Sequence, residues 1–369
     1  MKRIVIACDG TWNRLDSRWP TNVVKAAQAV LPAAPDGTVQ IVHHLDGVGT
    51  GRGTGALART WDRIAGGAFG EGLDGRLEEA YRVLVFNYAP GDEIYLLGYS
   101  RGAFLARSLA GLIRCAGVVL RRAAVAIPQA LALYKRRDPL GRPPDAVAAP
   151  GEPPVVNADD GIAASFRENY AHGDPPPIAY IGVWDTVGSL GIPDQLLLSR
   201  VFNRGLGFHD LKLSRRVGAA RHAVAIDERR RSFQPSLWKN LPALNAEAGA
   251  PLYLQSWFPG DHGSVGGGSN QTGLSDAAAL WVLEGAQAAG LALEAAALDK
   301  LAAGCDCRGQ LMDPDPGLVT RLMRRRAVDR EGPELPTDVS RPARDRWTLD
   351  ASYRPKPLAR VAAALDQPG

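Results

Sequence analysis

Short apolar runs recur between residues 4 and 258, and each has the length of one β-strand. They cover residues 4–7, 40–45, 94–99, 178–184, 222–226 and 252–258. Runs of this kind, without polar alternation, are typical of strands that are buried on both faces of a parallel sheet. Stretches with helical periodicity lie between them, at residues 22–30, 73–87, 101–117 and 275–287. The alternation predicts an α/β fold, a mostly parallel sheet with helices on both faces.

The alternation is interrupted in the middle of the chain. Residues 121–137 look helical and basic, and residues 138–177 are rich in proline. We therefore predict an insertion over residues 121–177 that forms either a loop or a lid over the site. Residues 1–310 are expected to form one domain that contains this insertion. Residues 311–369 are basic and weakly periodic, and we expect them to form a C-terminal extension packed on the same domain.

The charge balance changes this picture little. With 43 Lys and Arg against 39 Asp and Glu the net charge is +4, which gives no indication of a nucleic-acid partner. Arginines cluster at positions 121–122, 136–137, 229–231 and 324–326. Such clusters are usually solvated helix ends and loops. The alternative is a basic rim that makes peripheral contact with anionic lipid.

The first ten residues contain too short an apolar run for a signal peptide, and no apolar run reaches the length of a membrane span. The expectation is a cytoplasmic protein, with export by a route that needs no signal peptide left open. Cys8 and Cys115 lie in apolar segments, as reduced core cysteines do. Cys305 and Cys307 do not have the spacing of a zinc site.

The segment Gly98-Tyr99-Ser100-Arg101-Gly102 carries the most informative motif. It is a G-x-S-x-G sequence between an expected strand and an expected helix, which is the context of a nucleophile elbow. Small neighbours let strand and helix approach closely around a serine in strained backbone. The motif predicts a serine hydrolase with Ser100 as the nucleophile.

A serine nucleophile needs a histidine base and an acid that orients it. Polar residues suited to these roles follow the expected strands: Asp9, Ser100, Asp185, Asp227 and His262. The carboxyl ends of parallel strands meet at one edge of a sheet, where function gathers. Of the six histidines, His262 follows the last expected strand, in a glycine-rich loop, and is the predicted base.

The residues leave the acid open between two aspartates. Asp227 ends the strand after which the standard hydrolase layout places its acid. Its neighbours Glu228 and Arg229, however, suit an exposed, ion-paired site. Asp185 lies in VWDTVG, among apolar residues, as a buried orienting carboxylate should.

The oxyanion hole is expected from backbone N–H groups. One donor is the N–H of Arg101, and the second is that of Gly10 or Thr11 in the loop after the first strand. Asp9 is expected to support this loop through hydrogen bonds to its backbone. A glycine-rich stretch at residues 47–55 matches no nucleotide-binding fingerprint and is expected to form a flexible loop near the site.

An alternative hypothesis is a metal-dependent phosphatase that uses Asp9, Asp185 and Asp261. The D-x-D pair of haloacid-dehalogenase phosphatases is missing, because position 7 is alanine. We expect no catalytic metal and no cofactor.

Five sequence blocks together resemble a family. They are CDGTWN at 8–13, GYSRGAFLARSLAGLI at 98–113, GVWDTVGSLG at 182–191, AIDERRRSFQPSLW at 225–238 and WFPGDHGSVGGG at 257–268. In this order they resemble a bacterial and fungal α/β-hydrolase family, long labelled as of unknown function, that includes the phospholipase effectors of the type VI secretion system. The resemblance implies the triad Ser100, Asp185 and His262, and it favours Asp185 over Asp227.

The chain departs from the family pattern at one position after the base. The family usually reads His-Ser-Asp-Val-Gly-Gly-Gly, whereas here Ser264 stands in place of the aspartate.

The expected function is hydrolysis of a small-molecule or lipid ester through an acyl-enzyme, with phospholipase activity implied by the resemblance alone. A catalytically silent member that binds a lipid or a protein is the alternative.

Overall fold

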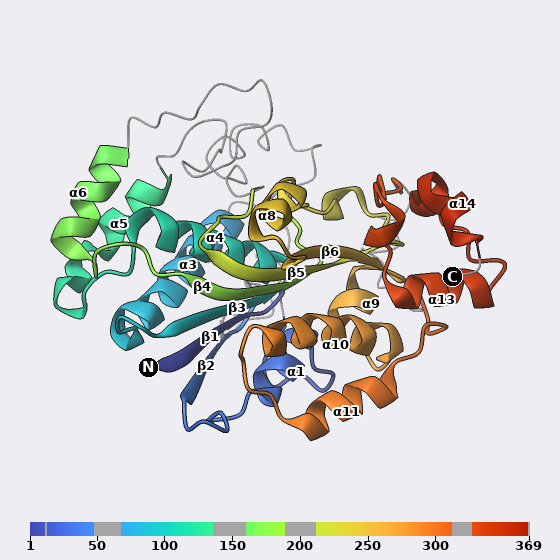
Figure 1. Ribbon diagram of the computed structural model, residues 1–369, viewed down its shortest axis with the longest axis horizontal. Helices are drawn as coiled ribbons and strands as arrows, with labels where there is room; N and C mark the ends of the chain where they lie inside the picture. The colour runs from blue at the N-terminus through green and yellow to red at the C-terminus, as the bar shows by residue number, and fades with distance from the viewer. Residues whose placement is uncertain (12, 48–67, 136–159, 189–211, 312–326, 368–369) are drawn as a thin grey trace.

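A computed structural model describes residues 1–11, 13–47, 68–135, 160–188, 212–311 and 327–367. Its centre is a six-stranded parallel sheet in the order β2-β1-β3-β4-β5-β6 (Figure 1). The strands are β1 (Lys2–Cys8), β2 (Val39–Leu45), β3 (Glu93–Tyr99), β4 (Ile178–Trp184), β5 (Val217–Ala225) and β6 (Tyr253–Phe258). All six predicted strands are present, and the predicted α/β-hydrolase fold is confirmed.

Side chains of strand β1 alternate between two cores, which explains why the strand is apolar throughout. Ile4 and Ile6 belong to the cluster on one face of the sheet, whereas Val5 and Ala7 belong to the cluster on the other. All four are fully buried. A strand with both faces covered needs no polar positions, so it reads as a continuous apolar run.

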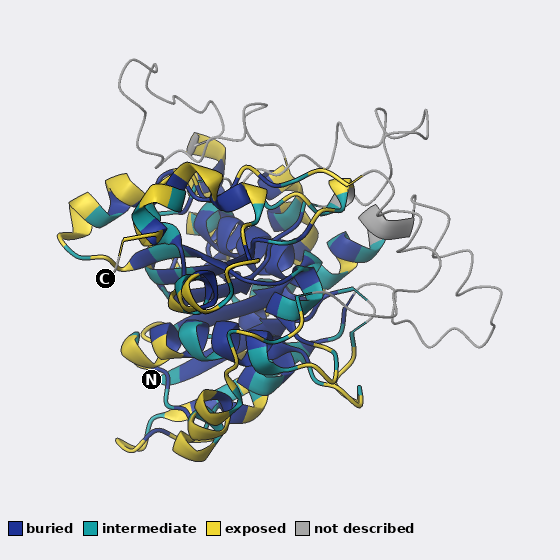
Figure 2. Ribbon diagram, turned by 90° about the vertical axis from the view of Figure 1, so that its right-hand side faces the viewer, coloured by how far each residue is buried: buried dark blue, intermediate teal, exposed yellow. Residues whose placement is uncertain are grey.

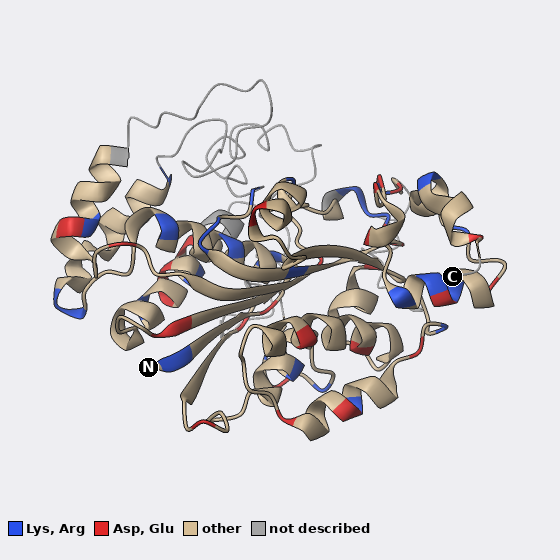
Figure 3. Ribbon diagram, in the orientation of Figure 1, with Lys and Arg blue, Asp and Glu red and all other residues tan. Residues whose placement is uncertain are grey.

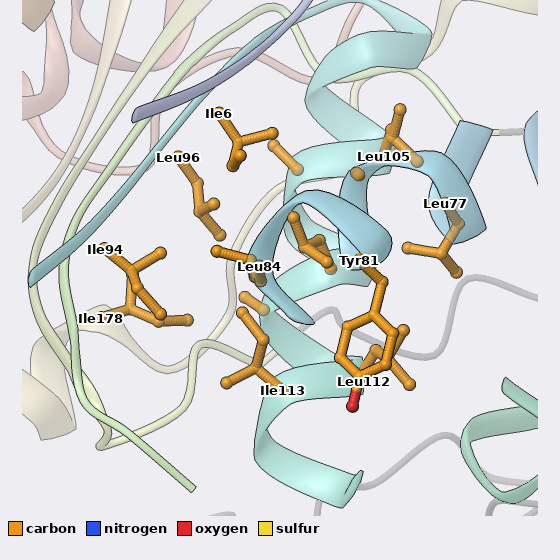
Figure 4. Packing of buried hydrophobic residues seen from close by; sticks show 14 of the residues in the cluster. Ile6, Leu77, Tyr81, Leu84, Ile94, Leu96, Leu105, Leu112, Ile113 and Ile178 are labelled. Atoms are coloured by element: carbon orange, nitrogen blue, oxygen red, sulfur yellow. The ribbon is translucent and has the colours of Figure 1, made fainter. Parts of the chain in front are cut away.

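One face of the sheet is covered by a group of helices. Helices α3 (Ala68–Asn87), α4 (Arg101–Ala116) and α5 (Ile127–Lys135) pack there with the shorter α8 (Leu241–Ala248). Figure 4 shows this core: Leu84 of α3 lies between Leu96 of β3 and Ile113 of α4, and the ring of Tyr81 lies beside Leu112.

The opposite face is covered by a second group of helices. These are α1 (Asn22–Ala29), α10 (Gly273–Ala288) and α11 (Ala295–Gly304). Their contact surface is rich in alanine, so α10 lies close to strands β4 and β5. Buried residues accordingly fill the middle of the molecule and exposed ones its outer helices (Figure 2). No helix of the described ranges combines the length and the apolar character that crossing a membrane requires.

A third, smaller core lies at the β6 edge of the sheet. Here the C-terminal segment, residues 327–367, forms η3 (Pro336–Asp338), α13 (Arg341–Leu349), η4 (Lys356–Val361) and α14 (Ala362–Leu365). Trp347 and Leu358 pack against Val224 and Trp257 of the last two strands. The backbone N–H of Ser340 donates to the carbonyl of Trp257 at 3.0 Å. The segment therefore packs on the hydrolase fold.

The predicted insertion is described in part. Residues 121–135 form η1 (Arg121–Ala126) and α5, while residues 136–159 lie outside the described residues. Helix α6 (Asp160–Tyr170) packs against the C-terminal end of α4, where Arg167 donates to the carbonyl of Cys115 at 2.7 Å. Because α4 has 16 residues, this end is about 24 Å from Ser100. The part of α6 around Arg167 thus lies away from Ser100, and the lid stays a prediction for the rest of the insertion, of which residues 136–159 lie outside the described residues.

The glycine-rich stretch at residues 47–55 is also described only at its first residue. Gly47 N donates to the carbonyl of Asn13 at 3.0 Å, which ties it to the loop after β1. The expectation of a flexible loop near the site falls, for residues 48–55, outside the described residues.

Candidate active site

Ser100 lies at the junction of β3 and α4 in a backbone conformation that side chains rarely adopt, with φ 59° and ψ −122°. Two glycines make the junction possible. A Cβ on Gly98 would lie 2.5 Å from the carbonyl oxygen of Gly102, and one on Gly102 would lie 2.1 Å from the carbonyl oxygen of Cys8. The Ser100 hydroxyl does not cap α4. The turn therefore leaves it for another partner.

That partner is His262, the first residue of the short helix α9 (His262–Gly266). The Ser100 hydroxyl donates to Nε2 of His262 at 2.7 Å, and Nδ1 of His262 donates to Oδ2 of Asp185 at 2.6 Å. The imidazole is packed on its flanks by Tyr99 at 4.8 Å and Phe233 at 4.9 Å between ring centroids. The ring is buried with both of its nitrogens engaged.

Asp185 lies in the turn that follows β4, with φ 40°. Its carboxylate accepts from four donors, the backbone N–H of Ala225 at 2.9 Å, His262, and two nitrogens of Arg330 at 2.6 and 2.9 Å. Burial alone would raise the pKa of this carboxyl. The charge of Arg330 and the hydrogen bonds from His262 and Arg330 outweigh burial and hold the pKa well below its ordinary value. Asp185 is an anion at neutral pH.

Arg330 is the residue of the site that the sequence did not predict. It comes from the C-terminal segment, 145 positions from Asp185, and its side chain is fully buried. The sequence around it, AVDREGPE, carries no motif. The available signal was indirect: a buried carboxylate among apolar residues needs donors, and an arginine is a common one.

Asp227, the alternative acid, has other partners. Its Oδ2 accepts from the backbone N–H of Gly260 at 2.7 Å and from the hydroxyl of Tyr353 at 3.0 Å. Burial raises the pKa of this carboxyl above its ordinary value, although both hydrogen bonds oppose the shift. The structure brings Asp185, and not Asp227, to His262.

The next residue, Glu228, has a role that sequence reasoning also missed. One of its oxygens accepts from the backbone N–H of His262 at 3.2 Å, and both bind Arg230. The guanidinium of Arg230 lies over the ring of Phe233, 3.7 Å from its centroid. Glu228 is thus buried and Arg230 half-buried beside the imidazole, whereas Arg229 is exposed, as its sequence context suggested, and pairs with Asp329 at 2.8 Å.

Two of the predicted oxyanion donors, Arg101 and Gly10, lie next to Ser100. Arg101 opens α4, and the first turn of a helix presents N–H groups without acceptors inside the helix. A Cβ on Gly10 would lie 3.2 Å from that of Ser100, so the loop after β1 borders the nucleophile position. The N–H of Gly10, however, donates to Oδ1 of Asp9 at 2.7 Å. The N–H of Thr11 is therefore the remaining candidate of the two in this loop.

Asp9 supports the loop, as expected from the sequence. Besides the N–H of Gly10, it binds the hydroxyl of Thr21 at 2.9 Å, and Nε2 of His44 lies 3.4 Å from its Oδ2. The hydroxyl of Thr21 also accepts from Val24 N at 3.3 Å and caps α1. Asp9 thus ties the end of β1 to α1 and β2.

Ser264, which replaces the family aspartate, is used as a donor. Its hydroxyl donates to Oδ1 of Asp261 at 3.0 Å, as does its backbone N–H, and it also lies 3.1 Å from the carbonyl of Leu311. Asp261 is the N-cap of α9. The pair therefore fixes the start of the helix that carries His262, which is a structural use of the position.

The aspartates of the phosphatase hypothesis do not converge. Asp9, Asp185 and Asp261 each bind a separate set of protein donors, as given above. Across the described ranges, no group of three or more His, Cys, Asp and Glu side chains could hold a metal ion. Their oxygens instead stabilise turns at the carboxyl edge of the sheet.

The arrangement can move a proton from the Ser100 hydroxyl to the imidazole while a fixed carboxylate faces the opposite ring nitrogen. Together with a parallel sheet and a strand–serine–helix turn, it places the protein in the α/β-hydrolase class. More specifically, the chain belongs to the family described as type VI secretion system (T6SS) phospholipase effector Tle1-like, catalytic domain. The match covers residues 2–285.

Individual relatives share only part of their length with this chain. A protein of Saccharomyces cerevisiae described as uncharacterized (YEL023C) is 27% identical over 249 residues, which are 65% of this chain and 33% of the yeast protein. Among solved structures, an uncharacterized protein from Pseudomonas aeruginosa has 16% identity and a TM-score of 0.42, over 88% of this chain and 52% of its own. A Tle1 effector bound to the VgrG spike has 19% identity and a TM-score of 0.38, over 73% of this chain and 52% of its own. The chain thus spans a third to a half of these proteins.

Proposed function

We propose that this protein is a serine hydrolase that cleaves carboxylic esters of lipids through an acyl-enzyme. The observation that carries the proposal is the continuous relay from Ser100 through His262 to Asp185, with contacts of 2.7 and 2.6 Å. Lipid as the substrate class is supported by membership of a family of phospholipase effectors.

In this mechanism Nε2 of His262 accepts the hydroxyl proton as the Ser100 oxygen attacks the ester carbonyl carbon. The backbone N–H groups of Arg101 and Thr11 stabilise the oxyanion that forms. Collapse of the tetrahedral intermediate releases the alcohol, which takes the proton from His262, and leaves the acyl group on Ser100. A water molecule, deprotonated by the same nitrogen, then hydrolyses the acyl-enzyme. Asp185 keeps its charge throughout and stabilises the imidazolium.

The rim of the site suits contact with a lipid surface. In the loop after β1, Leu15 and Trp19 are 54% and 42% exposed, and the guanidinium of Arg18 lies 5.0 Å from the Trp19 ring centroid. The loop begins at Gly10, which borders Ser100. An apolar and an aromatic side chain beside a cation are typical of surfaces that meet lipid headgroups.

The test compares Ser100→Ala with Ser108→Ala, a change of a buried serine on the same helix that takes no part in the relay. Ester hydrolysis should fall by several orders of magnitude in the first variant and stay near the wild-type rate in the second. A fluorophosphonate should label wild type and Ser108→Ala, but not Ser100→Ala. A folded Ser100→Ala protein with full activity would overturn the proposal.

The same assay separates the substrate classes. Phosphatidylglycerol vesicles and a soluble butyrate ester are offered to wild type and Ser100→Ala. Release of fatty acid from the vesicles by wild type alone supports a phospholipase. Cleavage of the butyrate ester alone would restrict the protein to soluble esters. A wild type that is not labelled and cleaves neither would favour the silent, ligand-binding alternative.

A further inference from the structure

Arg330 binds both oxygens of Asp185 and two backbone carbonyls. Nη1 donates to Oδ1 of Asp185 and to the carbonyl of Ala225, both at 2.6 Å. Nη2 donates to Oδ2 of Asp185 at 2.9 Å and to the carbonyl of Phe233 at 2.5 Å. The guanidinium is therefore locked in one plane by four acceptors. It presents its flat donor pair to the carboxylate, a geometry that lysine cannot reproduce.

This contact determines how Asp185 can orient. A carboxylate has about four lone-pair sites, and Asp185 has a donor at each: Ala225 N, His262 Nδ1 and the two Arg330 nitrogens. Without Arg330, two sites would lose their donors, and the carboxylate could rotate away from the imidazole. Arg330 thus selects the one rotamer of Asp185 whose carboxylate accepts from His262, and it does so from the side away from the imidazole.

The contact also changes the charge that the imidazole faces. A guanidinium within hydrogen-bond distance offsets the negative charge of Asp185, so His262 faces a paired carboxylate and not a bare one. Other ionisable or charged groups of the described residues also surround the ring. They are Tyr99 from β3, Glu228 and Arg230 after β5, and Asp261 before α9, with His222 of β5 behind Asp185.

We propose that Arg330 is a positioning residue of the triad, which locks and partly neutralises Asp185, and that the C-terminal segment thereby completes the active site. The proposal rests on the serine-hydrolase function proposed above. Arg330 lies outside residues 2–285, the range that matches the family. It reaches the triad because the third core seats the C-terminal segment on β5 and β6.

The two effects of Arg330 separate in two substitutions. Arg330→Lys keeps a positive charge but cannot bind both oxygens in one plane. Arg330→Gln keeps a donor and removes the charge. Loss of orientation should lower kcat in both variants by about 10- to 100-fold, the range seen for residues that orient a catalytic group, with KM little changed. Loss of charge should move the acid limb of the kcat/KM profile to higher pH by about one unit, in Arg330→Gln alone.

Arg346→Gln is the matched control. Arg346 is also a buried arginine of the C-terminal segment, and it donates to the carbonyls of Cys307 and Gly309 at 2.9 and 2.6 Å. It lies over the ring of Tyr353 and does not contact Asp185. Its loss should lower the melting temperature of the full chain but leave kcat per folded molecule and the pH profile unchanged.

The experiment measures ester hydrolysis against pH, the rate of fluorophosphonate labelling and thermal unfolding for the four proteins. The proposal is supported if both Arg330 variants lose kcat beyond the control and only Arg330→Gln shifts the acid limb. It is overturned if folded Arg330 variants match Arg346→Gln in kcat and keep the wild-type profile. If Arg330→Gln does not fold, Arg330→Lys alone decides through its kcat. A wild type that is not labelled at Ser100 refutes the proposed function, and this inference with it, a result distinct from those above.

Discussion

The turns after β4 and β5 lie side by side at the same edge of the sheet, and each begins with an aspartate, yet the two carboxyl groups behave in opposite ways. Asp185 has a pKa well below its ordinary value, because Arg330 and His262 outweigh its burial. Asp227 has a raised pKa, because its two donors, Gly260 and Tyr353, are neutral and burial dominates. Trp184 pairs with Ala223, so Asp185 lies opposite the end of β5 while Asp227 lies beyond it, and the two carboxyl groups face different segments.

The comparison teaches that the charge of each carboxyl group is determined by its distant partners. Both turns are reached by the C-terminal segment, which brings Arg330 to one and Tyr353 to the other. A cation makes the first carboxylate a permanent anion suited to face an imidazolium, whereas a phenol makes the second a structural acceptor.

The largest effect expected from this comparison is on catalysis. Asp185→Asn should lower kcat by about 10⁴-fold, as for the triad aspartate of serine proteases, because the amide cannot stabilise the imidazolium or fix the tautomer of His262. Asp227→Asn, the matched control on the neighbouring strand, should cost less than about tenfold. Steady-state kinetics of the two purified variants decide the matter, and a reversed ranking would assign the acid to the turn after β5.

A smaller effect is expected on the free energy of unfolding. Its pH dependence should have opposite signs in Asp185→Asn and Asp227→Asn. The pKa of Asp185 is lower in the folded state, so its contribution to the free energy of unfolding is present above the unfolded-state pKa of about 3.9 and is lost at lower pH. At pH 7, Asp185→Asn should cost about 3–5 kcal/mol, because Arg330 is left buried without its counter-ion.

For Asp227 the sign is reversed. Its folded-state pKa is raised, so its contribution is present below about pH 3.9 and is lost as the pH rises through the folded-state value. Asp227→Asn should therefore gain stability relative to wild type between pH 4 and pH 7.5. Urea denaturation at pH 4 and pH 7.5 measures the difference in free energy of unfolding between wild type and each variant. A difference that does not change with pH for either variant would contradict the directions of the two pKa shifts.

The smallest expected effect is on the free energy of unfolding and concerns His222, which supports the turn after β4. Its Nε2 accepts from the N–H of Thr186 at 3.1 Å, and burial lowers the pKa of the imidazole to about 3. The unfolded chain binds a proton near pH 6.5 that the folded one excludes, so wild-type stability should fall as the pH drops below 6.5. The stability gap between wild type and His222→Gln should narrow from pH 7 to pH 4.5. A constant gap would mean that His222 titrates equally in both states.

The strands and the nucleophile turn were predictable because local sequence determines them. Apolar runs of strand length and two glycines around Ser100 need no knowledge of distant residues, and the structure accounts for both through burial on two faces and close backbone approach. The choice between Asp185 and Asp227 was not decided by local sequence. Only the family resemblance favoured Asp185, and the geometry now places that residue beside His262.

The parts that could not be predicted depend on contacts across long sequence separations. Arg330 binds Asp185 from 145 positions away, and nothing in its neighbourhood distinguishes it from the other arginines of a basic segment. The use of the Gly10 N–H by Asp9 is local, but it depends on the direction of one carboxylate, which sequence does not fix. Many charged residues lie on the outer helices and loops (Figure 3), and the buried ones include Asp185, Glu228 and Arg330 around the imidazole.

The packing of the C-terminal segment along β6 has a consequence for how the protein behaves among its own copies. Strand β6 ends the sheet, and an open edge strand offers unpaired N–H and carbonyl groups to any other chain. Here Val339 forms a parallel bridge with Trp257, and the hydroxyl of Ser256 donates to the carbonyl of Asp338 at 3.1 Å. The segment thus works as a cover that blocks edge-to-edge pairing. A shortened chain that ends before it would be expected to self-associate during folding, quite apart from any loss of activity.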